Sequence, residues 1–177
     1  MTRTIWAITV GLFASVAPAQ AQPVPTSKFL LVGPAPSAEA GRVELTQAPR
    51  GLLVRIEASG LTPGWHAVHF HSVADCSDAG FKASGGHVHN MAAAASVHGL
   101  LNPDETDFGD LPNIYAGADG RANAEIFAPT LALGEVAGRV NLLDSDGSAL
   151  VIHASADDHQ SQPIGGAGAR VACAAIR

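Results

Sequence analysis

The sequence is poor in charged residues, and those it has are biased toward acids. Charged side chains make up 15% of the 177 residues and hydrophobic ones 47%, a balance that excludes an intrinsically disordered chain. Ten lysines and arginines stand against sixteen aspartates and glutamates, which leaves a formal net charge of -6. This shortage of positive charge argues against nucleic acids and anionic membranes as partners.

Long apolar runs are also scarce. The apolar run at residues 5–16 is shorter than the roughly 20 residues that a membrane span needs. It follows a positive start at Arg3 and precedes the small-residue pattern Ala19-Gln20-Ala21, as in secretory signal peptides. We therefore expect residues 1–21 to be a signal peptide and residues 22–177 to form one exported domain.

Cysteines are few, and their even number is informative. Cys76 and Cys173 are the two in the chain, and an even count in an exported protein favours a disulfide. The bridge would close a loop of about a hundred residues, worth up to roughly 4–5 kcal/mol in the chain-entropy model. Two buried free thiols are the alternative, which an oxidising compartment disfavours.

A sustained helical period is missing, and short alternating segments take its place. Between residues 72 and 111 no period holds, and Gly, Ala, Asp, Asn and His dominate. The pattern predicts an all-β antiparallel barrel or sandwich, with the segments 136–143 and 149–154 paired across the turn at residues 144–147. The other expected strands are 28–32, 42–46, 52–58, 64–71, 113–116, 122–127 and 169–176.

Histidines gather in the expected strand 64–71. His69 and His71 are two residues apart, so on a strand both imidazoles point to one side. Val68 and Phe70 then point to the other side, toward a core, and His66 shares their side. The strand therefore has the form of half a metal site, with His66 expected to be a core residue bonded to the backbone.

Further candidate ligands lie at the junctions of the expected elements. His87 and His98 fall in the long loop, His153 ends a strand, and Asp110 precedes one. Several imidazoles and a carboxylate in an exported protein suit copper or zinc. His89 and His159 are expected to be solvated loop histidines.

An ordered set of motifs now resembles a known family, the bacterial periplasmic copper/zinc superoxide dismutases, across nearly the whole exported chain. The motifs are Gly64-x-His66-x-x-His69-x-His71, Cys76, Gly85-Gly86-His87, His98-Gly99, Gly109-Asp110-Leu111-Pro112-Asn113, Leu150-Val151-Ile152-His153-Ala154 with Asp157-Asp158, and Gly165-Gly166-x-Gly168-x-Arg170-x-Ala172-Cys173. The resemblance implies an eight-stranded antiparallel Greek-key barrel or sandwich with long metal-binding and disulfide-tethered loops. It also implies a periplasmic oxidoreductase, monomer or homodimer, that converts superoxide to O2 and hydrogen peroxide. The alternative is a non-catalytic copper- or haem-binding module on the same fold.

The resemblance assigns roles to individual residues. His87 would bridge the two metals and take part in proton transfer, and Arg170 would hold superoxide beside the copper. Asp157 would link a copper-ligand histidine to a zinc-ligand histidine, and Cys76–Cys173 would tie the long loop to the strand of Arg170. The implied copper ligands are His69, His71, His87 and His153.

The zinc half departs from the family at one position. Three residues before Asp110, where the family has a histidine ligand, this chain has Asp107. The site could be His87, His98, Asp107 and Asp110, since carboxylate oxygen binds zinc. Otherwise zinc is weak or absent, or His89 substitutes. Positive charge to attract superoxide comes from Arg170 and, as a further candidate, Lys82.

Overall fold

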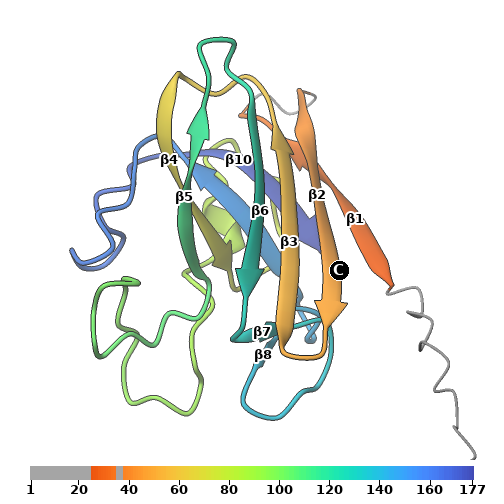
Figure 1. Cartoon of the computed structure of the whole chain (residues 1–177), viewed down its shortest axis with the longest axis vertical. Coiled ribbons are helices and arrows are strands. Elements are labelled where there is room, and N and C mark those ends of the chain that lie inside the picture. Colours follow the sequence, from red (N-terminus) through yellow and green to blue (C-terminus); the bar gives the residue numbers. More distant parts are fainter. Residues whose placement is uncertain (1–24, 35–37) are drawn as a thin grey trace, which may run out of the picture.

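One antiparallel sheet of eight strands forms the body of the molecule (Figure 1). The computed structural model describes residues 25–34 and 38–177, so the expected signal peptide at 1–21 lies outside the described residues. The spatial order of the strands is β5-β4-β9-β10-β1-β2-β3-β6. Their bounds are β1 Thr26–Val32, β2 Glu39–Ala48, β3 Gly51–Ala58, β4 Gly64–His71, β5 Asp110–Ala116, β6 Ala122–Ala128, β9 Ser148–His153 and β10 Arg170–Ile176.

The sheet curls until its two edges almost meet. The edge strands β5 and β6 follow each other in the chain across the turn at Asp119-Gly120, and they lie side by side in Figure 1. The chain leaves β3 at one end of the strand order and enters β4 near the other, which gives a Greek-key connection. This nearly closed, all-β barrel confirms the predicted fold class.

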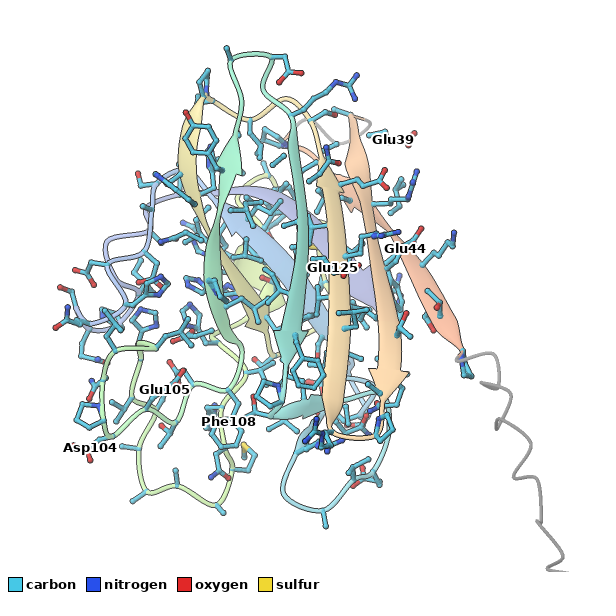
Figure 2. The ribbon with its side chains drawn as sticks, viewed as in Figure 1. Glu39, Glu44, Asp104, Glu105, Phe108 and Glu125 are labelled. Carbon is cyan, nitrogen blue, oxygen red and sulfur yellow. A yellow bond between two sulfur atoms is a disulfide. The ribbon has the colours of Figure 1, made fainter. Side chains whose placement is uncertain are left out.

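Alternation along the strands separates the core from the surface. In β3, the side chains of Leu52, Val54 and Ile56 are fully buried, while Arg55 between them is exposed. Because successive side chains on a strand point to opposite faces, the polar residues of β2, β3 and β6 line the outside. Glu44 and Glu125 lie on this outer face in Figure 2.

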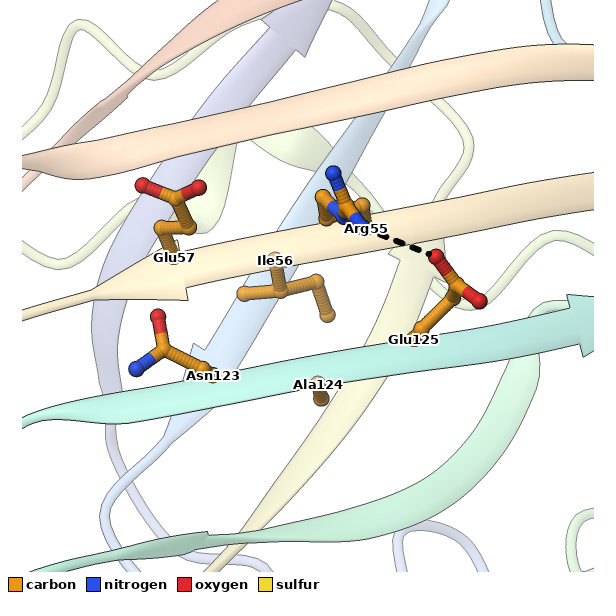
Figure 3. Close-up of a pocket in the computed structure, with 6 residues that line it drawn as sticks. All are labelled: Arg55, Ile56, Glu57, Asn123, Ala124 and Glu125. Atoms are coloured by element: carbon orange, nitrogen blue, oxygen red, sulfur yellow. Dashed lines mark ion pairs between the residues drawn. The ribbon is translucent and has the colours of Figure 1, made fainter.

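Cross-strand ion pairs occupy that outer face. Arg55 Nη2 lies 3.3 Å from Glu125 Oε2 in a shallow hollow between β3 and β6 (Figure 3). Lys28 Nζ lies 2.9 Å from Glu44 Oε1 in the same way on β1 and β2. Exposed pairs of this kind contribute at most about 1 kcal/mol each, so this face is a solvated surface.

One predicted strand pairing is wrong. Of residues 136–143, the short strand β8 (Val140–Asn141) covers only two, and it pairs in parallel with β7 (Leu131–Ala132). β9 pairs instead with β4 and β10. The side chain of Asn141 explains the loop conformation, because its Oδ1 accepts the backbone N–H groups of Gly134 and Leu143.

The long segment between β4 and β5 is a tethered loop with one 3-10 turn, η1 (Lys82–Ser84). Its middle and its C-terminal end are held against β4, since the Phe70 carbonyl accepts from Val88 N–H and the Phe70 N–H donates to the Gly109 carbonyl, both at 2.8 Å. In the described ranges, no helix has the length and apolarity needed to cross a membrane.

Candidate metal centre

Four histidines converge where the long loop covers β4 and β9. His69 and His71 come from β4, His153 ends β9, and His87 is brought in by a bridge between His71 and His87. One ring nitrogen of each lies within 4.8 Å of the others. All four side chains are buried, and we call this set the four-histidine group.

In three of these rings one nitrogen is already bonded, which determines the nitrogen left over. His69 Nε2 lies 2.8 Å from Asp157 Oδ2, His71 Nδ1 2.9 Å from the Gly85 carbonyl, and His153 Nδ1 3.2 Å from the Gly168 carbonyl. Such partners fix the tautomer and orientation of a ligand histidine. The remaining atoms, His69 Nδ1, His71 Nε2 and His153 Nε2, therefore face the centre of the group.

Burial keeps the imidazoles of His69, His71 and His153 neutral. It lowers the pKa of His71 to about 2 and the pKa of His153 to about 3, with His87 and Arg170 adding to the effect. It also lowers the pKa of His69, and the hydrogen bond from His69 to Asp157 opposes this only in part. A neutral imidazole has a lone pair to offer, which is the form that binds metals.

A second group shares His69 and His87 with the first and adds His98 and a carboxylate, and we call it the mixed group. It consists of His69, His87, His98 and Asp110. Asp110 Oδ1 lies 2.9 Å from His87 Nδ1, and its Oδ2 lies 2.6 Å from His98 Nδ1. The Gly99 N–H also donates to Asp110 Oδ2 at 2.8 Å, which positions the carboxylate.

Asp107 lies beside the mixed group. It is buried, and its Oδ2 is 3.6 Å from His87 Nδ1, while its Oδ1 accepts a short hydrogen bond from Ser96 Oγ. Burial, together with the charges of Asp110 and Asp107, raises the pKa of the neighbouring Glu105 to about 6. Glu105 lies in the same loop (Figure 2), so this side of the centre is rich in carboxylates.

Unpartnered buried atoms show that the residues suit metal ions. Among the described residues, six buried side-chain nitrogen and oxygen atoms make no hydrogen bond. Close approach alone does not form one: the Asp110 carboxylate lies near His87 and His98, but outside hydrogen-bonding geometry. Buried polar atoms are otherwise almost always bonded, and imidazole with carboxylate is a donor set for copper and zinc. Five of the six belong to the two groups: His71 Nε2, His87 Nδ1, His87 Nε2, His98 Nδ1 and Asp110 Oδ1.

Asp157 joins the two groups through its carboxylate. Its Oδ2 bonds His69 Nε2, and its Oδ1 lies 3.0 Å from His98 Nε2. Burial acts to raise the pKa of Asp157, but the hydrogen bonds from His69, from the His159 backbone and from His98 hold it well below its usual range. The carboxylate therefore stays ionised and orients His69, which belongs to both groups, and His98 of the mixed group.

Gly165 leaves the space that this carboxylate occupies, which leads to a test. A Cβ at position 165 would overlap Asp157 Oδ1 and approach His98 Nε2, and its φ of +57° favours glycine. We expect Gly165→Ala to displace Asp157 and weaken metal retention about 10- to 100-fold, the usual cost of losing such a partner. The measurement is metal release to a chelator. Gly166→Ala, where a Cβ meets nothing within 4 Å, is the control, and equal release from both variants would contradict the expectation.

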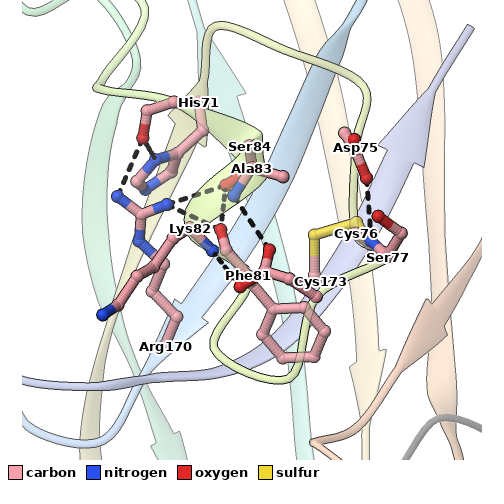
Figure 4. The surroundings of a disulfide bond; sticks show 12 residues. His71, Asp75, Cys76, Ser77, Phe81, Lys82, Ala83, Ser84, Arg170 and Cys173 are labelled. Carbon is pink, nitrogen blue, oxygen red and sulfur yellow. Dashed lines mark hydrogen bonds between the residues drawn. A yellow bond between two sulfur atoms is a disulfide. The ribbon is translucent and has the colours of Figure 1, made fainter.

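Arg170 lies next to the four-histidine group (Figure 4). It faces His153 across β9 and β10. Its Nη1 donates to the Phe81 carbonyl at 2.7 Å and to Ser84 Oγ at 3.0 Å, and its Nη2 donates to the Gly85 carbonyl at 2.8 Å. The Gly85 carbonyl is also the partner of His71 Nδ1, so one backbone group orients both side chains.

The disulfide Cys76–Cys173 joins the same loop to β10 (Figure 4). This confirms the disulfide expected from the cysteine count. It ties the segment that carries the carbonyl partners of Arg170 to the strand that carries Arg170 itself. Lys82 is exposed on that segment.

The structure brings the expected site residues together, changes the interpretation of His159 and adds Ser96. His66 is buried, with its ring nitrogens 2.6 Å and 2.7 Å from the carbonyls of His153 and Thr62, as expected of a core residue. His89 belongs to neither group. The expectation of a solvated His159 holds only in part, because its side chain is 18% exposed and its Nδ1 is buried. Ser96 was missed, since a lone serine in a loop carries no pattern.

Comparison with known proteins gives consistent matches over this domain. The family model for copper/zinc superoxide dismutase matches residues 39–176. A copper/zinc superoxide dismutase of Caulobacter vibrioides is 59% identical over 139 residues, which cover 78% of this chain and 79% of the relative. The crystal structure of a superoxide dismutase-like protein from Bacillus subtilis matches with a TM-score of 0.77 and 34% identity, covering 85% of this chain and 97% of that one. The copper/zinc superoxide dismutase from Brucella abortus matches with a TM-score of 0.67 and 30% identity, covering 86% and 100%.

Proposed function

Because the chain belongs to the copper/zinc superoxide dismutase family, we propose that its metal centre dismutates superoxide to O2 and hydrogen peroxide. The observation that carries the proposal is the set of unpartnered buried ligand atoms in two groups that share His69 and His87. The copper ligands would be His69, His71, His87 and His153. With this set intact, the alternative of a non-catalytic copper- or haem-binding module is not favoured.

Arg170 would bind the substrate anion. A guanidinium has five N–H donors, and three of those on Arg170 are used on the loop. Among the described residues, its Nε–H and one Nη2–H have no partner, so they can donate side by side to a diatomic anion. Burial lowers the pKa of Arg170, but an arginine remains charged at any physiological pH.

His87 would carry the proton. A bound copper ion supplies the one-electron redox chemistry that dismutation needs, and a bound zinc ion supplies a fixed positive charge on the other side of His87. Peroxide formation consumes protons, and both ring nitrogens of His87 lack hydrogen-bond partners in the described structure. We assign to Nε2 the uptake of a proton and its return to the product.

The assay for this proposal uses the metal-loaded exported domain. We expect superoxide removal well above that of the same copper concentration in buffer. Activity equal to free copper, with copper bound in the protein, would overturn the proposal and favour the non-catalytic module. A haem absorption band in the purified protein would favour the haem-binding version.

The zinc ligands would be His87, His98, Asp110 and Asp107. Ser96 supports Asp107 in this role, because its hydroxyl binds Oδ1 and leaves Oδ2 on the side of His87. His89 has less support: it lies outside both groups, and its Nδ1 is 3.5 Å from the His87 carbonyl. Two carboxylates would make this site more negative than one with three histidines.

Substitution of Asp107 tests this ligand set. We expect Asp107→Asn to weaken zinc binding about 100-fold or more, since losing a ligand should cost at least as much as losing its supporting partner. Asp107→His should retain zinc. The measurement is zinc affinity by competition with a chromophoric chelator, and unchanged affinity in Asp107→Asn would exclude Asp107 as a ligand. His89→Asn in parallel would reveal zinc binding through His89.

We also propose that residues 1–21 are removed on export and that the domain works in the periplasm as a monomer or homodimer. The sequence pattern around Ala21 and a disulfide that needs an oxidising compartment support this. The net charge of -6 supports the absence of nucleic-acid and membrane partners. Protein from a periplasmic fraction should begin at Gln22, and a sequence that begins at Met1 would contradict processing.

A further inference from the structure

A third histidine lies against the Asp157 carboxylate. His159 donates its backbone N–H to Asp157 Oδ1 at 2.7 Å, and its Nδ1 lies 3.4 Å from Asp157 Oδ2. The same Oδ2 bonds His69 Nε2. His159 Nδ1 is also the one unpartnered buried atom of the described residues that lies outside the two metal groups.

A fixed amide determines the tautomer of His159. The Asp157 N–H donates to Asn113 Oδ1 at 2.8 Å, so the oxygen of that amide is identified and its Nδ2 points the other way. Asn113 Nδ2 donates to the Asp157 carbonyl at 2.8 Å and lies 3.2 Å from His159 Nε2. Because an amide nitrogen only donates, Nε2 must accept, and the proton of the neutral ring lies on Nδ1, facing Asp157.

The backbone at His159 is held in place by the loop that carries His98. Its φ is +60°, a left-handed conformation that non-glycine residues adopt only where the surroundings impose it. The His159 carbonyl accepts from Leu101 N–H at 3.1 Å and approaches Gly99 so closely that a Cβ there would overlap it. His159 is therefore fixed between Asp157 and the segment that follows His98.

We propose that His159 is a positioning residue of the metal centre: the dipole of its Nδ1–H, whose nitrogen lies 3.4 Å from Asp157 Oδ2, favours the carboxylate orientation in which Asp157 bonds both His69 and His98. The inference rests on the proposed function, since it takes those two histidines as ligands of different metals. It predicts that loss of the side chain of His159 weakens both metals together, although His159 touches neither ligand ring.

Three variants separate the effect of the His159 Nδ1 donor from the effect of the backbone conformation. His159→Gly removes the ring and suits a φ of +60° without strain. His159→Asn tolerates the same φ and can place an amide N–H where Nδ1 was. Gln160→Gly is the control, because Gln160 is exposed and the change frees the backbone one residue further along without touching Asp157.

The experiment measures release of copper and zinc to a chelator from the fully loaded protein. For His159→Gly we expect about 10-fold faster release of both metals, the lower end of the effect of outer partners, with a changed copper(II) electron paramagnetic resonance spectrum. His159→Asn and Gln160→Gly should stay near wild type. Release from His159→Gly at the wild-type rate, or an equal loss in His159→Asn, would overturn the inference.

A second measurement reads the tautomer directly. Long-range proton–nitrogen NMR spectra of the zinc-loaded, copper(I) protein should show His159 neutral with its proton on Nδ1, and a proton on Nε2 would overturn the inference. Neither readout depends on turnover. If the wild-type protein binds both metals without dismutating superoxide, the proposed function fails while the role of His159 is still tested.

Discussion

Arg170→Ala is expected to lower kcat/KM for superoxide about 100- to 1000-fold. This is the range found when one preorganised donor to a developing anion is removed from an enzyme site. In a chain of net charge -6, the guanidinium beside His153 and His71 is the cation that the structure places at the four-histidine group. Its loss removes both the charge and the two free N–H groups.

Two controls separate substrate binding from loop structure. Arg170 also donates to Phe81, Ser84 and Gly85, so the copper content of the variant must be measured with its kinetics. Arg170→Lys should recover part of the rate, because it keeps the charge but loses the planar fork. Raised ionic strength should slow the wild type more than Arg170→Ala. A copper-loaded Arg170→Ala with the wild-type kcat/KM would contradict the assignment.

Removal of the disulfide is expected to lower the free energy of unfolding by about 4–5 kcal/mol in the chain-entropy model. The bridge joins positions 97 residues apart, so its loss frees most of the unfolded chain. The double variant Cys76→Ala, Cys173→Ala avoids placing a hydroxyl at Cys173, which is fully buried. We also expect reduced activity, because the bridge tethers the loop segment that orients Arg170.

Urea denaturation of the metal-stripped protein measures this effect without a contribution from metal binding. Wild type treated with a reductant should unfold at the same midpoint as the double variant, and the reductant should not shift the variant further. An unfolding free energy equal to that of the oxidised wild type would show that the bridge does not stabilise the domain.

The strands could be predicted where alternation is strong. Val54 and Ile56 alternate with Arg55 and Glu57, and the structure buries Val54 and Ile56 in β3 as expected. The prediction of a strand at residues 136–143 was wrong because most of this apolar segment lies in a loop. There the Asn141 side chain accepts hydrogen bonds from the backbone, which replace the expected pairing. A side chain that competes for backbone groups leaves no periodic pattern in the sequence.

The ligand residues could be predicted for a different reason. His69 and His71 share a face because a strand has a period of two, and the motif resemblance supplied His87, His98, Asp110 and His153. Ser96 and His159 could not be found in this way. Their roles depend on contacts with Asp107 and Asp157 that form only when the two long loops fold over β4.

The sequence by itself determined the all-β class and the division of the histidine strand into a core face and a metal face, which follow from local periodicity. The resemblance to a known family supplied the identity of most candidate ligands. The tertiary structure alone decided which ring nitrogen of each histidine is free, where Asp107 stands relative to His87, and that His159 lies against Asp157. These depend on hydrogen bonds between segments far apart in the chain, and no local pattern encodes such contacts.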